Sequence, residues 1–315
     1  MDRIKLSEGS GGSEMNAFIS GFTNGFFRGK WKGTDDDSAY LDMGDSYLCF
    51  TTDSYTVSPL FFPGGNIGDL AVCGTLNDLA VMGAKPLALS LGLVIEEGFS
   101  RDDFDLIMKT IGNLSKKTGV PIVTGDTKVI ESREGLLINT SGVGICKKSE
   151  LLDKEPAIGD KIIVSGSVGD HSAALLSKRF DYETDVVTDS KPIFPEIEKI
   201  RDLIKIAKDP TRGGLGGVLY DISDKSGLGV RVEEPLPAKR GVLAVTKMLG
   251  LSLYELACEG RFLCVASGEN SKEVCKRLPD AQIIGEITEK DVIIKTKIGS
   301  SILPRPSGRL IPRIC

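Results

Sequence analysis

Five aspartates are placed where a folded chain of strands and helices could gather them into one site. Asp53 and Asp126 directly follow expected strands, and sites of open α/β sheets form at strand ends. Asp78 lies in an expected helix that is apolar nearly all round, where an unpaired carboxylate would be costly. Asp37 ends an acidic triplet, which in most proteins is a solvated turn, and Asp209 opens a glycine-containing turn. Because Mg²⁺ takes carboxylate ligands and bridges them to phosphate oxygens, these five residues predict a magnesium site.

Two glycine-rich segments are candidates for binding phosphate. The first comprises Gly9, Ser10, Gly11 and Gly12, whose backbone N–H groups can approach an anion closely, although a flexible N-terminus explains them equally well. In the second, Asp209 to Gly214, Arg212 adds positive charge and Gly213 frees the amides of the helix that follows. The P-loop pattern and the kinase catalytic loop are absent from the sequence. These features predict an ATP-using enzyme without a P-loop.

Four further residues are candidates for the same site. Lys128, two residues after Asp126, can neutralise charge on a transferring phosphoryl group, and the neighbouring Thr127 and the helical Asn77 are candidate nucleotide ligands. Glu259 lies between apolar segments, so a raised pKa would suit it to accept a proton. A salt bridge from Glu259 to Arg261 or to another base is an equally good explanation.

A thiol occupies the last position of the chain, Cys315. The residues before it contain three prolines and two glycines, which exclude a helix or an inner strand, and no acidic residue follows Lys295. We therefore expect residues 302–315 to form a mobile arm with a reach of about 45 Å. One interpretation is a frayed tail with an incidental cysteine, and the other is a swinging arm whose thiol carries a substrate group into an active site.

The expected elements form two domains. Strands are expected over 47–52, 86–95, 120–124 and 136–146, with helices over 14–22, 67–82 and 100–118. After a charged stretch the pattern restarts, with strands over 161–165, 205–207, 261–266 and 282–287 and helices over 170–180 and 215–226. This alternation predicts an α/β (α+β) chain with domains over 1–152 and 153–301, followed by the arm. The single histidine, His171, is interpreted as a capping or packing residue in preference to a catalyst.

Composition excludes several classes of protein. The chain has 315 residues, of which 41% are hydrophobic and 26% charged, and its net charge of −5 argues against general nucleic-acid binding. We expect no membrane span and no signal peptide, because the apolar run over 86–95 is too short and the N-terminus leads into no apolar segment. Seven cysteines without a C-x-x-C pair indicate a cytoplasmic protein. The six cysteines other than Cys315 are expected to be core residues.

The motifs together resemble one known family. The segments that carry the resemblance are Thr51-Thr52-Asp53-Ser54, Phe62-Pro63-Gly64-Gly65-Asn66-Ile67-Gly68, Gly74-Thr75-Leu76-Asn77-Asp78-Leu79-Ala80, Gly125-Asp126-Thr127-Lys128, Asp209-Pro210-Thr211-Arg212-Gly213-Gly214 and the terminal Pro312-Arg313-Ile314-Cys315. They resemble the HypE family of hydrogenase maturation proteins, within the aminoimidazole-ribotide-synthetase-like superfamily. Glu8 stands where that family often has histidine, and Asn66 where aspartate is common, which leaves the expected metal ligands intact.

The resemblance implies a two-domain PurM-like fold, a homodimer through the N-terminal sheets, and a reaction. A HypF-type carbamoyltransferase would load a carbamoyl group onto Cys315. ATP would then phosphorylate the carbamoyl oxygen, and loss of a proton and of phosphate would leave a thiocyanate. The cyano group would pass to iron on a HypC–HypD complex for the [NiFe]-hydrogenase. The alternatives are another ATP-using enzyme of the superfamily, such as a small-molecule kinase or a selenophosphate-synthetase-like enzyme, and a non-catalytic scaffold.

Overall fold

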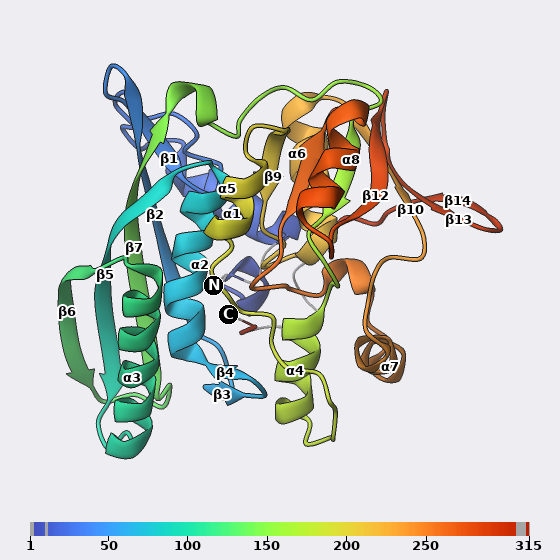
Figure 1. Ribbon diagram of the computed structural model, residues 1–315. Coiled ribbons are helices and arrows are strands. Elements are labelled where there is room, and N and C mark those ends of the chain that lie inside the picture. The colour runs from blue at the N-terminus through green and yellow to red at the C-terminus, as the bar shows by residue number, and fades with distance from the viewer. Residues whose placement is uncertain (1–2, 10–11, 307–312, 315) are drawn as a thin grey trace.

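The structure, a computed structural model, describes residues 3–9, 12–306 and 313–314 of the chain. It consists of two β-sheets with helices between and around them, and helix α2 (Ile67–Val81) lies between the two halves (Figure 1). Helix α2 packs on strands β2 and β7 of the first sheet and also contacts helix α5 and strand β9 of the second half. The helix therefore joins the two cores, which places any residue on it close to both halves.

The first sheet has five strands in the order β1 (Ala39–Asp42), β2 (Ser46–Tyr55), β7 (Leu136–Lys147), β5 (Lys85–Glu96) and β6 (Ile122–Ile130). Only β5 and β6 run parallel, and helix α3 (Arg101–Thr118) makes the crossover that such a pair requires. Ahead of the sheet are a 3₁₀ turn (Leu6–Gly9) and helix α1 (Gly12–Thr23). The short hairpin of β3 (Phe61–Phe62) and β4 (Gly65–Asn66) leads into α2.

Helix α2 begins where its sequence provides a cap. The Asn66 side chain accepts a hydrogen bond from the N–H of Gly68 at 2.8 Å, and the Asp69 carboxylate accepts one from the N–H of Asn66 at 2.8 Å. This capping box satisfies amides that the first turn leaves without partners. Apolar residues surround the helix, and 13 of its 15 residues are buried, as its composition predicts.

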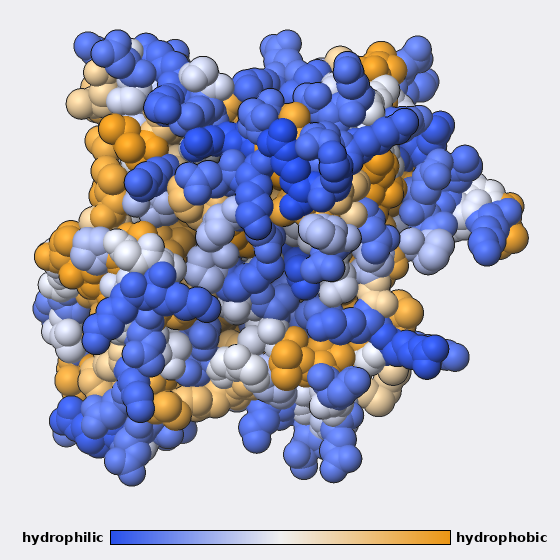
Figure 2. Space-filling view, in the orientation of Figure 1, coloured by the Kyte–Doolittle hydropathy of each residue, from blue (hydrophilic) through white to orange (hydrophobic). Residues whose placement is uncertain are grey.

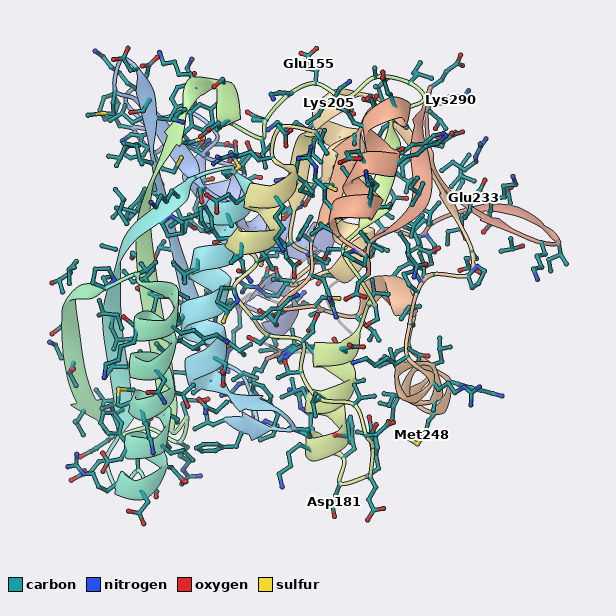
Figure 3. The ribbon with its side chains drawn as sticks, viewed as in Figure 1. Glu155, Asp181, Lys205, Glu233, Met248 and Lys290 are labelled. Carbon is teal, nitrogen blue, oxygen red and sulfur yellow. The ribbon has the colours of Figure 1, made fainter. Side chains whose placement is uncertain are left out.

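The second sheet has seven strands in the order β14 (Gly299–Ile302), β13 (Val292–Thr296), β10 (Gly229–Glu233), β12 (Gln282–Thr288), β8 (Lys161–Val164), β11 (Leu263–Ala266) and β9 (Ile204–Lys208). Its helices are α4 (Asp170–Arg179), α5 (Phe194–Ile200), α6 (Gly214–Ser226), α7 (Arg240–Leu249) and α8 (Gly268–Arg277), and 3₁₀ turns span Lys148–Glu150 and Leu253–Glu255. Helices α4 and α7 form one end of this half, where Asp181 and the 59% exposed Met248 point into solvent (Figure 3).

The predicted α/β fold class is confirmed, and most expected elements are present within two residues of their predicted ends. The sheets occupy 39–147 and 161–302, and the domain limits 152 and 301 remain predictions. Within the described part of the chain, no helix combines the length and apolar character needed to cross a membrane.

The expectation of a mobile arm from residue 302 is wrong for the residues that the structure describes. Ile302 ends strand β14, Leu303 is only 3% exposed in the second core, and the Tyr220 hydroxyl donates a hydrogen bond to the Leu303 carbonyl. Arg305 forms an ion pair with Asp224 of α6 at 2.6 Å. The prolines end the regular structure, but they do not prevent apolar and charged side chains from packing.

Candidate active site

A cavity of about 540 Å³ opens between the two halves. Strand β2 and helix α2 form one wall, and the segment that connects β9 to α6 forms the opposite wall. Its polar lining consists of Thr34, Asp36, Asp37, Thr51, Thr52, Asp53, Ser54, Tyr55, Asp78, Lys208, Asp209, Thr211, Arg212, Asp221 and Glu259. A cavity of this size accommodates a nucleotide-sized ligand.

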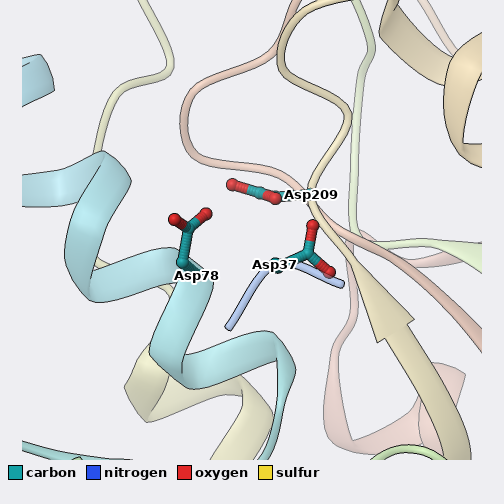
Figure 4. A group of neighbouring side chains, drawn as sticks. All are labelled: Asp37, Asp78 and Asp209. Carbon is teal, nitrogen blue, oxygen red and sulfur yellow. The ribbon is translucent and has the colours of Figure 1, made fainter. Parts of the chain in front are cut away.

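Three of the five predicted metal ligands meet in this cavity. Asp37, Asp78 and Asp209 each provide a carboxylate oxygen, and these oxygens lie within 4.8 Å of one another. Figure 4 shows the three side chains converging from the segment before β1, from α2 and from the end of β9. Each half of the molecule contributes, so the cluster forms only when the halves are packed together.

The cluster is electrostatically unfavourable without a cation. Burial raises the pKa of Asp78 well above its ordinary value, and the carboxylates of Asp53, Asp209 and Asp37 raise it further. The pKa of Asp209 is raised by burial and by Asp37 and Asp53, and its Oδ2 is buried without a hydrogen-bond partner among the described residues. Closely spaced carboxylates with an unsatisfied oxygen fit a hard divalent cation, so the residues are suited to hold Mg²⁺.

A lysine that the sequence analysis did not identify compensates part of this charge. Lys208 Nζ lies 2.9 Å from Asp37 Oδ2 and 3.2 Å from Asp36 Oδ1. Burial alone would lower the pKa of Lys208, but the carboxylates of Asp37 and Asp36 raise it above its usual value. The last two aspartates of the acidic triplet are therefore folded over this lysine and do not form the solvated turn that such triplets usually form. The signal was present, since Lys208 ends a strand beside Asp209.

Asp53 was predicted to follow the end of a strand. In the structure it lies inside strand β2, which continues to Tyr55. Its carboxylate is 26% exposed, lies 3.8 Å from the Arg212 guanidinium and accepts a hydrogen bond from the Tyr55 hydroxyl at 3.2 Å. Arg212 lines the cavity, and the next residue, Gly213, has a left-handed backbone with φ of 85° directly before the first residue of α6. The predicted roles of Asp53, Arg212 and Gly213 at the site remain compatible with their positions.

Glu259 lies in the wall of the same cavity and is only 2% exposed. Burial raises its pKa well above the ordinary value, and Asp209 and Asp189 add to the effect. Its Oε1 is buried and has no hydrogen-bond partner in the described part of the chain. Arg261, the alternative partner suggested by the sequence, lies 3.8 Å from Asp189 instead. The pairing with Arg261 is thus not formed, the charge of Arg212 lowers the pKa of Glu259 only in part, and the role of Glu259 as proton acceptor stays a prediction.

Asn77 was predicted to bind the nucleotide, and the structure contradicts this. The residue is 1% exposed, and its side-chain amide donates to the carbonyls of Lys191 and Glu259, each at 3.1 Å. Its Oδ1 accepts a hydrogen bond from the N–H of Ile193 at 2.9 Å. All three partners belong to the second half, so the side chain of Asn77 connects that half to α2.

Asp126, Thr127 and Lys128 were predicted to hold metal and phosphate, and the structure places them elsewhere in their own chain. Strand β6 continues through them to Ile130, so they lie within an edge strand instead of following it. The side chains of Asp126 and Lys128 are 72% and 63% exposed and pair with each other at 2.7 Å. None of the three is among the described residues that line the cavity.

The remaining predicted residues concern the two ends of the chain. Gly9 ends the first 3₁₀ turn and is exposed, and Gly12 begins α1, whose Met15 lines the cavity. Ser10 and Gly11 lie outside the described residues, as does Cys315. The described residues closest to Cys315, Arg313 and Ile314, form hydrogen bonds with both halves of the molecule.

Comparison with known proteins identifies relatives along the whole chain. Residues 35–146 match the family "AIR synthase related protein, N-terminal domain" and residues 157–297 match its C-terminal domain family. The chain is 40% identical to the carbamoyl dehydratase HypE of Bradyrhizobium diazoefficiens, over 99% of this chain and 96% of that protein.

Two solved structures are similar in both sequence and shape. A HypE–HypF complex gives a TM-score of 0.83 at 38% identity, covering 93% of this chain and 99% of that one. HypE in complex with ATP gives a TM-score of 0.80 at 34% identity, covering 99% of this chain and 100% of that one.

Proposed function

We propose, because this chain belongs to the HypE family of AIR synthase related proteins, that it is an ATP-dependent carbamoyl dehydratase acting on its own Cys315. The family that the sequence motifs predicted is confirmed by relatives of nearly equal length. ATP is its co-substrate, as the structure of a relative in complex with ATP supports. The cavity between the two halves is the expected position of the nucleotide.

The observation that carries the proposal is the contact between Arg313 and the residue that follows strand β2, which forms a wall of the cavity. Arg313 Nε donates to the carbonyl of Thr56 at 2.8 Å, and the preceding residue, Tyr55, lines the cavity. Ile314 is 6% exposed and belongs to the same apolar core as Tyr55. A kinase for a free small molecule would have no need for its own C-terminus at this point. A dehydratase that works on a tethered thiol requires it.

The proposed reaction proceeds in two steps. The oxygen of the S-carbamoyl group attacks the γ-phosphorus of ATP, and the bond to ADP breaks. The phosphorylated intermediate then loses both protons from nitrogen and expels phosphate, so the carbon–nitrogen bond becomes a nitrile. Phosphate leaves readily where an amide oxygen would not, so one ATP removes the oxygen and two hydrogens of one water.

The described residues fit defined parts of this reaction. Asp37, Asp78 and Asp209, with Asp53 beside them, would hold Mg²⁺, which when bound neutralises phosphate charge. Arg212, which lines the cavity, would bind a phosphate oxygen. Glu259 is the proposed proton acceptor, and the positive charge of a bound Mg²⁺ would bring its raised pKa back toward the working range.

A homodimer would account for the exposed strand β6. Its outer edge pairs with no strand among the described residues, and it exposes Val123 and Val129 at 63% and 64%. Figure 2 shows apolar side chains at the edge of the molecule that β5 and β6 occupy. Unpaired edges with apolar residues are suited to association. In a dimer through this sheet, Asp126, Thr127 and Lys128 would bind metal and phosphate in the partner's cavity.

We further propose a HypF-type carbamoyltransferase as the donor of the carbamoyl group and a HypC–HypD complex as the acceptor of the cyano group. A relative crystallised with HypF supports the first partner. The thiocyanate would thus supply cyanide ligands to the iron of [NiFe]-hydrogenase. The described cysteines are all unpaired, which is consistent with a reducing cytoplasm.

The test is mass spectrometry of the C-terminal peptide. After loading by HypF, addition of ATP should convert carbamoylated Cys315 to a product lighter by one water. The Cys315→Ala variant should form no such product while binding ATP with wild-type affinity in calorimetry. ATP turnover that proceeds equally well in Cys315→Ala would favour a kinase acting on a free substrate and refute the proposal.

A further inference from the structure

The carbonyl groups of Arg313 and Ile314 are held by donors from both halves of the molecule. The N–H of Ser58 donates to the Arg313 carbonyl at 3.2 Å, and the guanidinium of Arg179 donates to the same oxygen at 2.9 Å. The Ile314 carbonyl lies 2.9 Å from Nε2 of His171. Two consecutive carbonyls are therefore fixed by three donors, two of which belong to helix α4.

The side chain of Arg313 is recognised separately. Its Nε donates to the carbonyl of Thr56 at 2.8 Å, and its guanidinium pairs with Glu134 at 2.8 Å. Glu134 lies in the turn between β6 and β7, so the first half supplies both contacts. A planar guanidinium suits this combination of a carbonyl and a carboxylate, which a lysine would satisfy only in part.

His171 is built to donate to the chain's end. It is completely buried, and burial lowers its pKa to about 4, so the ring is neutral at physiological pH. A carbonyl only accepts hydrogen bonds, so Nε2 carries the proton, and Nδ1 accepts from the Thr188 hydroxyl at 2.9 Å. The Phe62 ring packs edge-on against the imidazole, with 5.2 Å between the two ring centroids. Without Ile314, this N–H would lose its partner in a buried position, which is unfavourable.

We infer that these groups form a receptor, here called the tail seat, that recognises Arg313 and Ile314 and positions Cys315 for dehydration. The tail seat comprises Thr56, Ser58, Glu134, His171 and Arg179. This inference rests on the proposed function. It assigns positioning roles to residues that do not line the cavity, and it makes the arginine and the apolar residue before the cysteine a recognition sequence.

The seat also contains an unfavourable contact. Burial lowers the pKa of Arg179, and the nearby positive charge of Arg313 lowers it further. Repulsion between these two guanidinium groups offsets part of the hydrogen bonding.

Hydrogen exchange of the Ser58 amide measures seating without any chemistry. In the full-length protein, Arg313→Ala should raise exchange at Ser58 about tenfold, because it removes a charged side chain with two hydrogen-bonded partners. Arg305→Ala is the matched control: it also removes one arginine near the C-terminus, but that arginine pairs with Asp224 on α6. Equal exchange at Ser58 in the two variants would overturn the tail seat.

A second measurement uses the reaction. With HypF-loaded protein and saturating ATP, Arg313→Ala and His171→Phe should slow a single round of dehydration about tenfold, while the KM for ATP stays unchanged. His171→Gln retains an N–H that can reach the carbonyl and should restore most of the rate. If His171→Phe and His171→Gln are slowed equally, or if only the KM for ATP changes, the positioning role is refuted.

The two measurements separate this inference from the function on which it rests. If wild-type protein forms no thiocyanate but Ser58 exchange still responds to Arg313→Ala and not to Arg305→Ala, the seat exists and the proposed reaction is wrong. If thiocyanate forms at the same rate in all variants, the reaction stands and the seat has no role in it.

Discussion

A carboxylate oxygen of Asp78, on the helix between the two sheets, lies within 4.8 Å of one from Asp209, at the end of a strand in the second sheet. Burial raises the pKa of both carboxylates, and the charge of Asp209 raises that of Asp78 further. Packing of the two halves therefore creates a site that is unfavourable by itself and becomes favourable when a cation binds. Stability and ligand binding are coupled through this pair.

The first prediction concerns the stability of the metal-free protein. Because the folded-state pKa of Asp78 is raised, the folded chain binds more protons than the unfolded chain above the ordinary carboxylate range, so stability falls as pH rises through that window. Asp78→Asn removes the part of this dependence that Asp78 contributes. We expect the difference in Tm between Asp78→Asn and the wild type to increase by a few degrees in favour of the variant as the pH rises from about 5 to about 8, in thermal unfolding with a chelator.

Asp126→Asn is the control for this experiment. That carboxylate is 72% exposed, and its pKa is lowered by Lys128, so its replacement should leave the pH dependence of the wild type in place. Mg²⁺ with ATP should reverse the ranking of wild type and Asp78→Asn at high pH. Parallel curves for the wild type and Asp78→Asn would contradict the assignment of a raised pKa to this group.

The second prediction is that Glu259→Gln separates binding from chemistry. The amide is nearly the same size and can remain in the buried position, but it cannot accept the proton. Dehydration should slow by about 10²- to 10⁴-fold, with calorimetric ATP affinity close to that of the wild type. Glu255→Gln, on the neighbouring 3₁₀ turn, should leave the rate unchanged. A Glu259→Gln enzyme of normal rate would remove Glu259 from the mechanism.

The sequence predicted the local features of this fold well. Helix α2 could be recognised because apolar residues surround it and its cap is encoded by Asn66 and Asp69. Asp78 and Glu259 could be identified as site residues because a carboxylate in an apolar segment has few structural uses. Both conclusions depend only on residues that are close together in the chain.

Relations between distant segments could not be predicted in this way. Strand β6 was expected to end before Asp126, because glycine and aspartate are poor strand formers, but pairing with β5 carries it through to Ile130. Asn77 and Asp78 are equivalent by local pattern, and only the packing of the second half determines which faces the cavity. The seating of Arg313 depends on contacts with residues more than 100 positions away.

The third prediction tests whether β6 serves a second copy of the chain. Asp126→Asn and Asp78→Asn should each impair Mg·ATP turnover if Asp126 acts in the partner's cavity. Random mixing of the two inactive chains then gives heterodimers in which one of two sites has both aspartates. Activity should recover to about a quarter of the wild-type value after subunit exchange. Full activity of Asp126→Asn alone, or no recovery on mixing, would exclude action in the partner.

The fourth prediction compares two lysines that share a partner. Lys208 and Lys225 both pair with Asp36, but their side chains are 10% and 47% exposed. Lys208→Met leaves the partly buried Asp36 and Asp37 with less compensation and should cost about 3 kcal/mol of unfolding free energy. Lys225→Met should cost less than about 1 kcal/mol, because its charge is partly screened by solvent.

The difference should depend on pH in a defined direction. Burial would raise the pKa of Asp36, but Lys208 and Lys225 together lower it, so their stabilising effect is present above the ordinary carboxylate pKa and is lost as the pH falls through the lowered value. Urea unfolding of both variants at neutral and at acidic pH measures this. The unfolding free energy of Lys208→Met should approach that of the wild type only at acidic pH. Equal losses of unfolding free energy for the two substitutions at neutral pH would show that Lys208 does not hold the acidic turn over the site.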